Sequence, residues 1–347
     1  IYNFIVKNKS LAAIDIGTNT FRLLIAEVLR DAHKKNNYNI NEICSERIIT
    51  RLGEGIHESG LIKKKAMAKG ITALKKFSDT ISRHNVYKTS VIATSALREA
   101  KNRDEFLKKA KEATGLDIEI ISGEEEARKT SLGMLLGITI PKTALMADIG
   151  GGSTELIFIG QRKPELVHSL NLGVVYLADK YMKNDPPLKK DLGHMDRHIS
   201  KEIGTIVRPF SELITQNSHL GESPEVTKLP GLAQRSGAGK TVFVGTAGTV
   251  TTLSAISQHL TKFEHNKIHN SKLTIEEIRN IFSKISTITA KERVKYHPFE
   301  PERLDIIVPG TIILLKILET FGFKEVIVSN YGLREGILLD LYEKIKN

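Results

Sequence analysis

The chain has 347 residues, enough for about two domains, and its 40% hydrophobic content is typical of a globular protein with a real core. The single cysteine, Cys44, excludes an internal disulfide and indicates a reducing compartment such as the cytoplasm, and no apolar stretch is long enough for a membrane span. The net charge of +11 favours polyanionic partners, but only 6% aromatic residues and no tryptophan argue against a base-stacking nucleic-acid surface.

The first third of the chain predicts an α/β pattern. Apolar runs predict strands over 11–16, 20–28, 38–50, 88–93 and 117–121, and helical spacing predicts helices over 61–83 and 104–114. The strand over 88–93 runs directly into Arg98 at the start of a further helix. Ligands of open α/β sheets sit at the carboxyl ends of strands, where a guanidinium suits a phosphate. An ordinary exposed helix arginine is the alternative.

Three glutamates open the helix that follows Ser122. Ser122 and Glu125 predict a capping box, and acidic residues are normal in a first helical turn. Capping accounts for one or two of Glu124, Glu125 and Glu126. A third leaves room for a catalytic base at a strand end.

The rest of the chain repeats the order of strands and helices. Strands are predicted over 143–149, 154–160, 165–170, 242–244 and 325–329, and helices after 173, over 189–206, after 248, and over 301–320 and 333–345. Residues 216–240 are rich in Gly, Ser and Pro without periodicity, which predicts a mobile surface insertion.

A glycine-rich turn lies between the strands over 143–149 and 154–160. Three successive glycines, Gly150 to Gly152, weaken a strand but let a backbone come close to phosphate oxygens. Asp148 and Glu155 add two carboxylates, which are hard ligands suited to Mg²⁺. A tight hairpin with a solvated aspartate is the competing interpretation of this segment alone.

The same pattern occurs earlier, at Asp15-Ile16-Gly17-Thr18-Asn19-Thr20, and the two aspartates are 133 residues apart (148 − 15). This offset is too long for a solenoid repeat and indicates a duplicated domain half. Two such halves, with their turns facing across a cleft, resemble the actin-like, sugar kinase and heat-shock ATPase superfamily. A third glycine turn, Gly245 to Thr249, feeds a helix and suits an anion.

Taken together, the motifs resemble those of the exopolyphosphatase and guanosine pentaphosphate phosphohydrolase (Ppx/GppA) family. The matching pieces span nearly the whole chain in the family's order: residues 15–20, 94–98, 121–128, 148–155, 185–187, 245–249 and 331–336. The resemblance implies that Glu126 is the catalytic base, that Arg98 binds phosphate, and that Asp148 and Glu155 are metal-linked acids, with Asp15 as a further metal candidate.

The resemblance also implies the architecture: two actin-like (ribonuclease H-like) α/β domains with mixed sheets and a cleft between them. We expect the first domain at 1–129 plus 333–347 and the second at 130–332. The expected phosphate-binding residues are those of the three turns: Gly17, Thr18, Asn19 and Thr20; Gly150, Gly151, Gly152 and Ser153; and Gly245, Thr246, Ala247, Gly248 and Thr249.

The expected activity is hydrolysis of the terminal phosphoanhydride of inorganic polyphosphate with Mg²⁺, or Mn²⁺ in its place, by a homodimer in the cytoplasm. Hydrolysis of guanosine pentaphosphate is the alternative within the family. Outside the family, the same residues are compatible with an ATP-dependent kinase of the same superfamily and with a non-enzymatic polyanion-binding protein. The chain departs from the family by lacking room for a C-terminal HD-type helical domain, and His269-Asn270 stands where His-Gly is expected.

Overall fold

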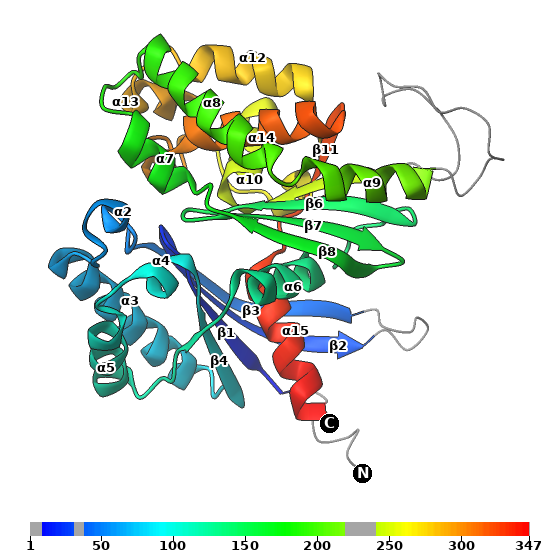
Figure 1. The fold of residues 1–347 in the computed structure, drawn as a ribbon. Coiled ribbons are helices and arrows are strands. Elements are labelled where there is room, and N and C mark those ends of the chain that lie inside the picture. Colours follow the sequence, from blue (N-terminus) through cyan, green and yellow to red (C-terminus); the bar gives the residue numbers. More distant parts are fainter. Residues whose placement is uncertain (1–8, 31–37, 219–240, 347) are drawn as a thin grey trace. The chain divides into compact units, whose positions relative to one another are not determined.

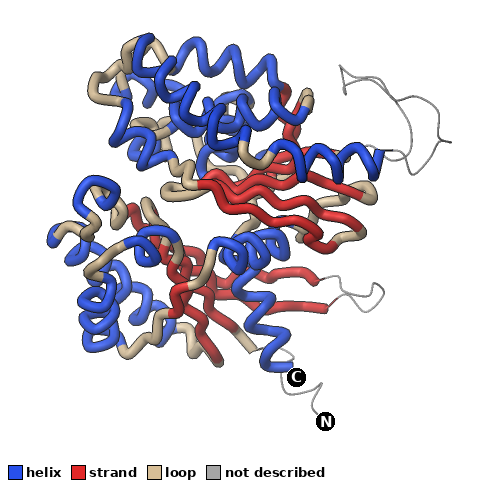
Figure 2. Tube along the Cα trace, in the orientation of Figure 1, coloured by secondary structure: helices blue, strands red, loops and turns tan. Residues whose placement is uncertain are grey.

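The computed structural model describes residues 9–30, 38–218 and 241–346. The chain divides into two compact units, unit 1 with residues 1–137 and 331–347, and unit 2 with residues 138–330. Each unit is a mixed β-sheet with helices packed on it (Figure 1, Figure 2). The predicted fold class is therefore confirmed. The predicted boundary at 129/130 falls inside helix α6 (Gly123–Met134), which unit 1 holds complete.

The sheet of unit 1 has the strand order β3-β2-β1-β4-β5. Its strands are β1 (Leu11–Ile16), β2 (Thr20–Arg30), β3 (Tyr38–Ile49), β4 (Lys88–Ala93) and β5 (Glu119–Ile120). The pairs β1–β2 and β2–β3 are antiparallel, while β1–β4 and β4–β5 are parallel.

Helices cover both faces of this sheet. On β1, Ile14 packs into a core shared with α3 (Lys64–Arg83) and α5 (Arg103–Thr114), whereas the preceding residue, Ala13, packs into a core shared with α15 (Leu333–Lys346). Because successive strand residues point to opposite faces, a strand buried on both sides is apolar throughout. Short helices α2 (Ile56–Ser59) and α4 (Ser95–Glu99) complete the unit.

The sheet of unit 2 repeats that of unit 1. Its strands are β6 (Thr143–Ile149), β7 (Thr154–Gly160), β8 (Lys163–Leu170), β9 (Val242–Thr246), β10 (Lys272–Thr274) and β11 (Glu325–Val328). Read from one edge, the order β8-β7-β6-β9-β11 has the same directions as β3-β2-β1-β4-β5, with β10 added antiparallel at the far edge. The equivalent strand orders of the two sheets thus confirm the internal duplication that the two Asp-Gly turns predict.

The helices of unit 2 pack around one large core. They are α7 (Val174–Tyr181), α8 (Lys189–Gly204), α9 (Val207–Ser218), α10 (Ala247–Ser257), α11 (His265–Ile268), α12 (Ile275–Ile285), α13 (Ala290–Arg293) and α14 (Ile307–Phe321), with 3₁₀ turns at Val294–Tyr296 and Pro301–Arg303. The apolar run of α14 is buried in this core. Among the described residues, no helix is both long and apolar enough to cross a membrane.

Several predicted boundaries are wrong. Residues 216–218 are the end of α9 and not part of an insertion, because Phe210, Leu213 and Ile214 pack on the core and keep the chain helical. Residues 219–240 of the predicted insertion lie outside the described residues. The helix predicted over 301–320 begins only at Ile307, after the 3₁₀ turn, and the strand predicted over 117–121 has two residues.

A charge cluster joins α6 to the terminal helix α15 within unit 1. The α6–α15 charge cluster consists of Glu125, Arg128 and Lys129 on α6 and Asp340 and Lys344 on α15. Arg128 contacts Glu125 through Nε (2.7 Å) and Asp340 through Nη2 (2.9 Å). Lys129, whose side chain is 3% exposed, contacts Asp340 and lies 3.1 Å from Glu125 Oε1. Charged side chains therefore connect the two helices, with Lys129 and Asp340 mostly buried and the other members more exposed.

This cluster predicts a loss of stability in acid. Hydrogen bonds from Arg128 lower the pKa of Glu125 to about 2, against the opposing effect of burial. Burial raises the pKa of Asp340, but hydrogen bonds from Lys129, Arg128 and Lys344 outweigh it and hold that pKa well below its usual range. Both carboxyls have unfolded-state pKa values of about 4, so the unfolded state binds more protons in acid. We therefore expect the free energy of unfolding to fall as the pH drops from about 4 toward about 2.

Chemical denaturation at stepped pH values measures this fall. The Asp340→Asn variant is expected to show a shallower fall over the same range, because one of the two titrating carboxyls is gone. An equally steep fall in the variant would mean that other carboxyls cause the acid sensitivity.

Candidate active site

The β6–β7 turn of unit 2 presents backbone N–H groups to one side. Gly150 N donates to Ser153 O (2.9 Å), and a Cβ on Gly150 would lie 3.0 Å from the same oxygen. Two N–H groups at the start of α7 donate to the carbonyl oxygens of Gly150 and Gly151 (3.1 and 2.9 Å). A trans peptide points its C=O and the following N–H in opposite directions, so the N–H groups of Gly151 and Gly152 face away from α7. Such groups suit phosphate oxygens.

The β1–β2 turn of unit 1 repeats this arrangement. Gly17 N donates to Thr20 O (3.2 Å). The carbonyl oxygens of Thr18 and Asn19 accept hydrogen bonds from backbone N–H groups of the loop over 50–53, at 2.9 to 3.0 Å. By the same peptide geometry, the N–H groups of Asn19 and Thr20 face away from that loop. Each unit thus holds one turn whose carbonyls are used internally and whose amides point the other way.

Two carboxylates lie opposite each other beside the turn of unit 2. Asp148 at the end of β6 pairs in register with Glu155 on β7, so both side chains leave the same face of the sheet. Glu155 is buried, with 1% of the residue exposed, and its Oε1 accepts a hydrogen bond from Ser169 Oγ (2.7 Å). Asp148 is half-buried. Two like charges directly opposite on a sheet repel each other, and a cation between them would relieve that repulsion.

The third metal candidate has different surroundings. Asp15 lies in unit 1 at the end of β1, and its partner in register on β2 is Arg22 instead of an acid. Within the described ranges there is no group of three or more His, Cys, Asp or Glu that could hold a metal. Magnesium commonly takes only one or two protein carboxylates, with phosphate oxygens and waters completing the octahedron. Asp148 and Glu155 therefore fit as the protein's share of such a site.

The third glycine turn connects β9 to α10 next to Asp148. Thr246 is the partner of Asp148 in the parallel pairing of β6 and β9. The side chain of Thr246 donates to Ser329 O (3.0 Å), and Ala247 takes a left-handed φ of 70°. A positive φ at a residue with a Cβ is uncommon and clusters at functional turns. The eleven-residue helix α10 begins at this turn, and a helix N-terminus favours anions.

Arg303 is a basic residue at this turn that sequence reasoning missed. Its Nη1 lies so close to Gly248 that a Cβ there would be only 2.0 Å away. Its Nε lies 3.0 Å from Glu300 Oε2, and its side chain is 10% exposed. Only the fold brings residue 303 to residue 248, and no local sequence signal marks it.

In unit 1, the structure brings Arg98 and Glu126 together. Arg98 on α4 donates through Nη1 to the carbonyl oxygen of Ile121 (2.9 Å), the residue before the cap of α6. The same Nη1 lies 3.2 Å from Glu126 Oε2. The side chain of Glu126 is 10% exposed and that of Arg98 is 28% exposed. A guanidinium that suits phosphate thus lies beside a nearly buried carboxylate.

The three glutamates at the start of α6 have three different environments. Ser122 caps the helix by accepting from Glu125 N (3.2 Å), but the Glu125 side chain turns to Arg128 instead of completing a capping box. Glu124 is exposed. Glu126 alone is buried against Arg98. This sorting favours Glu126 as the base, as the resemblance implies.

Two other motifs of the resemblance have structural roles. Both carboxylate oxygens of Asp185 accept a hydrogen bond from Ala290 N (2.9 Å each) and so cap α13. In the motif over 331–336, Gly332 N donates to Glu335 Oε2 (2.8 Å), and a Cβ on Gly336 would lie 1.7 Å from the carbonyl oxygen of Lys129. The glycines of this motif let α15 pack directly on the backbone of α6.

A duplicated mixed sheet, with a glycine turn and an acid at the end of the equivalent strand in each half, is the architecture of an actin-like protein. The family model that matches residues 30–345 is that of the Ppx/GppA phosphatase family. The chain belongs to that family, which confirms the resemblance and the predicted enzyme class.

Known proteins similar to this chain are consistent with membership of this family. The chain is 28% identical to exopolyphosphatase 2 of Mycobacterium tuberculosis, over 95% of this chain and 98% of that protein. It is 32% identical to a bifunctional 3-dehydroquinate synthase/phosphatase of Fusobacterium nucleatum, over 96% of this chain but only 47% of that protein. It also resembles the crystal structure of the Aquifex aeolicus Ppx/GppA family member, with 30% identity, a TM-score of 0.73, and coverage of 97% of this chain and 98% of that one.

Proposed function

We propose that the protein is an exopolyphosphatase, which hydrolyses the terminal phosphoanhydride of inorganic polyphosphate and releases orthophosphate. The observation that carries this proposal is the 3.2 Å contact between Arg98 Nη1 and Glu126 Oε2, because it puts a phosphate-binding group beside a buried candidate base. The similarity to exopolyphosphatase 2 over nearly its whole length supports the substrate class.

In this mechanism, Glu126 accepts a proton from the attacking water. The water oxygen forms a bond to the terminal phosphorus, the bridging P–O bond breaks, and the shortened chain leaves as the other product. In unit 1, Arg98 and the outward-facing amides of the turn at 17–20 bind phosphoryl oxygens. In unit 2, the amides of the turns at 150–153 and 245–249 are suited to the same task, and Arg303 adds a guanidinium at the turn over 245–249. Phosphoryl transfer depends mainly on positioning and charge stabilisation, which these groups supply.

Asp148 and Glu155 would hold a Mg²⁺ ion, or Mn²⁺ in its place, and Asp15 remains a further candidate. When bound, the ion neutralises charge on the phosphate oxygens. Two other predictions also remain proposals. The single cysteine favours the reducing cytoplasm, and the family resemblance suggests a homodimer.

Chain length and salt concentration test the substrate. The net charge of +11 attracts a long polyanion, and each phosphate engaged adds a salt-sensitive contribution, by analogy with nucleic acids. We expect kcat/KM to rise with polyphosphate chain length at low salt, and this advantage to shrink at moderate salt. Guanosine pentaphosphate offers fewer phosphates and should show a shallower salt dependence. Phosphate release from both substrates and from ATP, measured in parallel, provides the comparison.

Three different outcomes would each point to another function. A preference for guanosine pentaphosphate at both salt concentrations, with no effect of chain length, would make the nucleotide the substrate. Consumption of ATP only with a phosphate acceptor would indicate a kinase. Tight binding of polyphosphate without any phosphate release would indicate a polyanion-binding protein.

A further inference from the structure

We propose that the α6–α15 charge cluster positions Glu126, and that Asp340 is the positioning residue at its centre. The inference rests on the proposed role of Glu126 as the base. It assigns a role in the reaction to helix α15, which contributes no residue to the proposed phosphate-binding turns.

The position of α6 decides the contact between Arg98 and Glu126. Arg98 comes from α4 and is tied to Ile121 O by a 2.9 Å hydrogen bond, immediately before the cap of α6. Glu126 lies in the first turn of α6 itself and reaches the same guanidinium nitrogen from there. A rotation or slide of α6 would therefore move the carboxylate relative to the guanidinium, which comes from α4.

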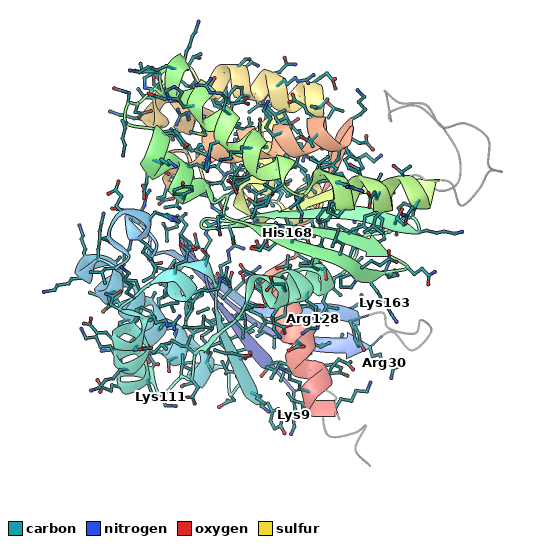
Figure 3. All side chains as sticks on the ribbon, in the orientation of Figure 1. Lys9, Arg30, Lys111, Arg128, Lys163 and His168 are labelled. Atoms are coloured by element: carbon teal, nitrogen blue, oxygen red, sulfur yellow. The ribbon has the colours of Figure 1, made fainter. Side chains whose placement is uncertain are left out.

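The helix α15 packs on α6 through direct backbone contact. A Cβ on Gly133 would lie 1.9 Å from Gly332 O, and a Cβ on Gly336 would lie 1.7 Å from Lys129 O, so the two backbones touch at both places. The cluster adds directional contacts one turn closer to Glu126. Lys129 and Arg128 each contact both Glu125 and Asp340. Figure 3 labels Arg128, which lies on α6 next to α15.

The packing of α15 in unit 1 does not require the charged side chains of the α6–α15 charge cluster. Buried apolar residues of α15, among them Ile337, Leu338 and Leu341, already pack in the core that it shares with β1 and β2. A buried ion pair is often no more stabilising than apolar side chains of the same volume, because removing charges from water is costly. What charged hydrogen bonds add is direction, since they favour one orientation of α6 on α15 over its neighbours. Two acids and two buried or half-buried cations between the helices are suited to that task.

The Asp340→Asn variant tests the proposal. It keeps the shape of the side chain but weakens its contacts with Lys129 and Arg128. Because a misplacement of about 1 Å can cost up to about 10²-fold in rate, we expect kcat to fall by about tenfold or more with little change in KM. Asp340→Glu restores the charge and should recover much of the lost kcat.

A matched control is Glu46→Gln in the same unit. Glu46 has a similar side-chain exposure, 18% against 15% for Asp340, and contacts Lys76 (2.7 Å) and Thr80 (2.6 Å) on α3. The Glu46→Gln variant should lower the midpoint of thermal unfolding without lowering the kcat of the folded protein. If Asp340→Asn likewise lowers only the midpoint, the cluster is merely stabilising and the proposal is wrong. Should Asp340→Asn fail to fold, Arg128→Gln serves in its place, because the Arg128 side chain is 40% exposed.

The double variant separates this proposal from the proposed function. If Asp340 acts through Glu126, then Asp340→Asn should cause little further loss of kcat in a Glu126→Gln background, because effects of residues that act as a unit are not additive. The same fold-loss in both backgrounds would overturn the positioning role while leaving Glu126 as the base. Wild-type kcat in Glu126→Gln alone would overturn the role of Glu126, and this inference with it.

Discussion

Glu126→Gln is expected to lower kcat by about 10²–10⁴-fold, the usual contribution of a general base. The amide has the shape of the carboxylate but cannot accept the proton of the attacking water. Arg98 keeps its hydrogen bond to Ile121 O, so the phosphate-binding group stays in place and KM should change little. Steady-state phosphate release from long-chain polyphosphate, with the thermal midpoint measured on the same preparation, gives the comparison.

Glu124→Gln is the matched control for this experiment. It makes the same chemical change two residues away in the same helical turn, at an exposed side chain, and should leave kcat near the wild-type value. Glu126 is not the base if its variant keeps kcat within about threefold of wild type, far short of the loss of a general base. A large loss in both variants would point to the charge of the helix start instead of one carboxylate.

The sequence was enough to predict the fold class because the signals for it are local and repeated. Each Asp-Gly turn lies between two apolar runs, and a hairpin follows from that pattern without knowledge of the rest of the chain. The family and the duplicated sheets are accordingly confirmed. A helix that sequence reasoning passed over, α12, also carried a local signal, because Thr274 and Glu277 form a capping box at its start.

The arrangement of side chains was harder to predict, since it depends on contacts between distant residues. Sequence reasoning assigned Glu125 to a capping box with Ser122, and the resemblance implied that Glu126 is the base. In the structure, Glu125 meets Asp340 of α15 through Arg128 and Lys129, while Glu126 meets Arg98. The identities of these site residues stay predictions until variants are measured.

The surroundings of the metal candidates were also hard to predict from the sequence. Asp15 and Asp148 occupy equivalent positions in the two repeats, and the resemblance implies a metal role for Asp148, with Asp15 as a further candidate. Their partners across the hairpin differ, because Asp15 is opposite a basic residue, Arg22, and Asp148 is opposite an acid, Glu155. Charge compensation by an arginine reduces the need for a cation, whereas two facing carboxylates increase it. We therefore expect the metal requirement to depend more strongly on Asp148 than on Asp15.

Removal of divalent metal is expected to abolish activity, and addition of Mg²⁺ or Mn²⁺ to restore it. Asp148→Asn should raise the metal concentration needed for half-maximal activity, because it leaves one carboxylate of the facing pair, and Asp15→Asn should raise it less. Glu165→Gln, which changes an exposed carboxylate on the neighbouring strand β8, is the control and should leave the metal requirement as it is in the wild type. Metal titrations of phosphate release at fixed polyphosphate concentration compare the four proteins. Full activity in excess chelator would remove the metal from the mechanism, and a larger shift for Asp15→Asn than for Asp148→Asn would move the site to unit 1.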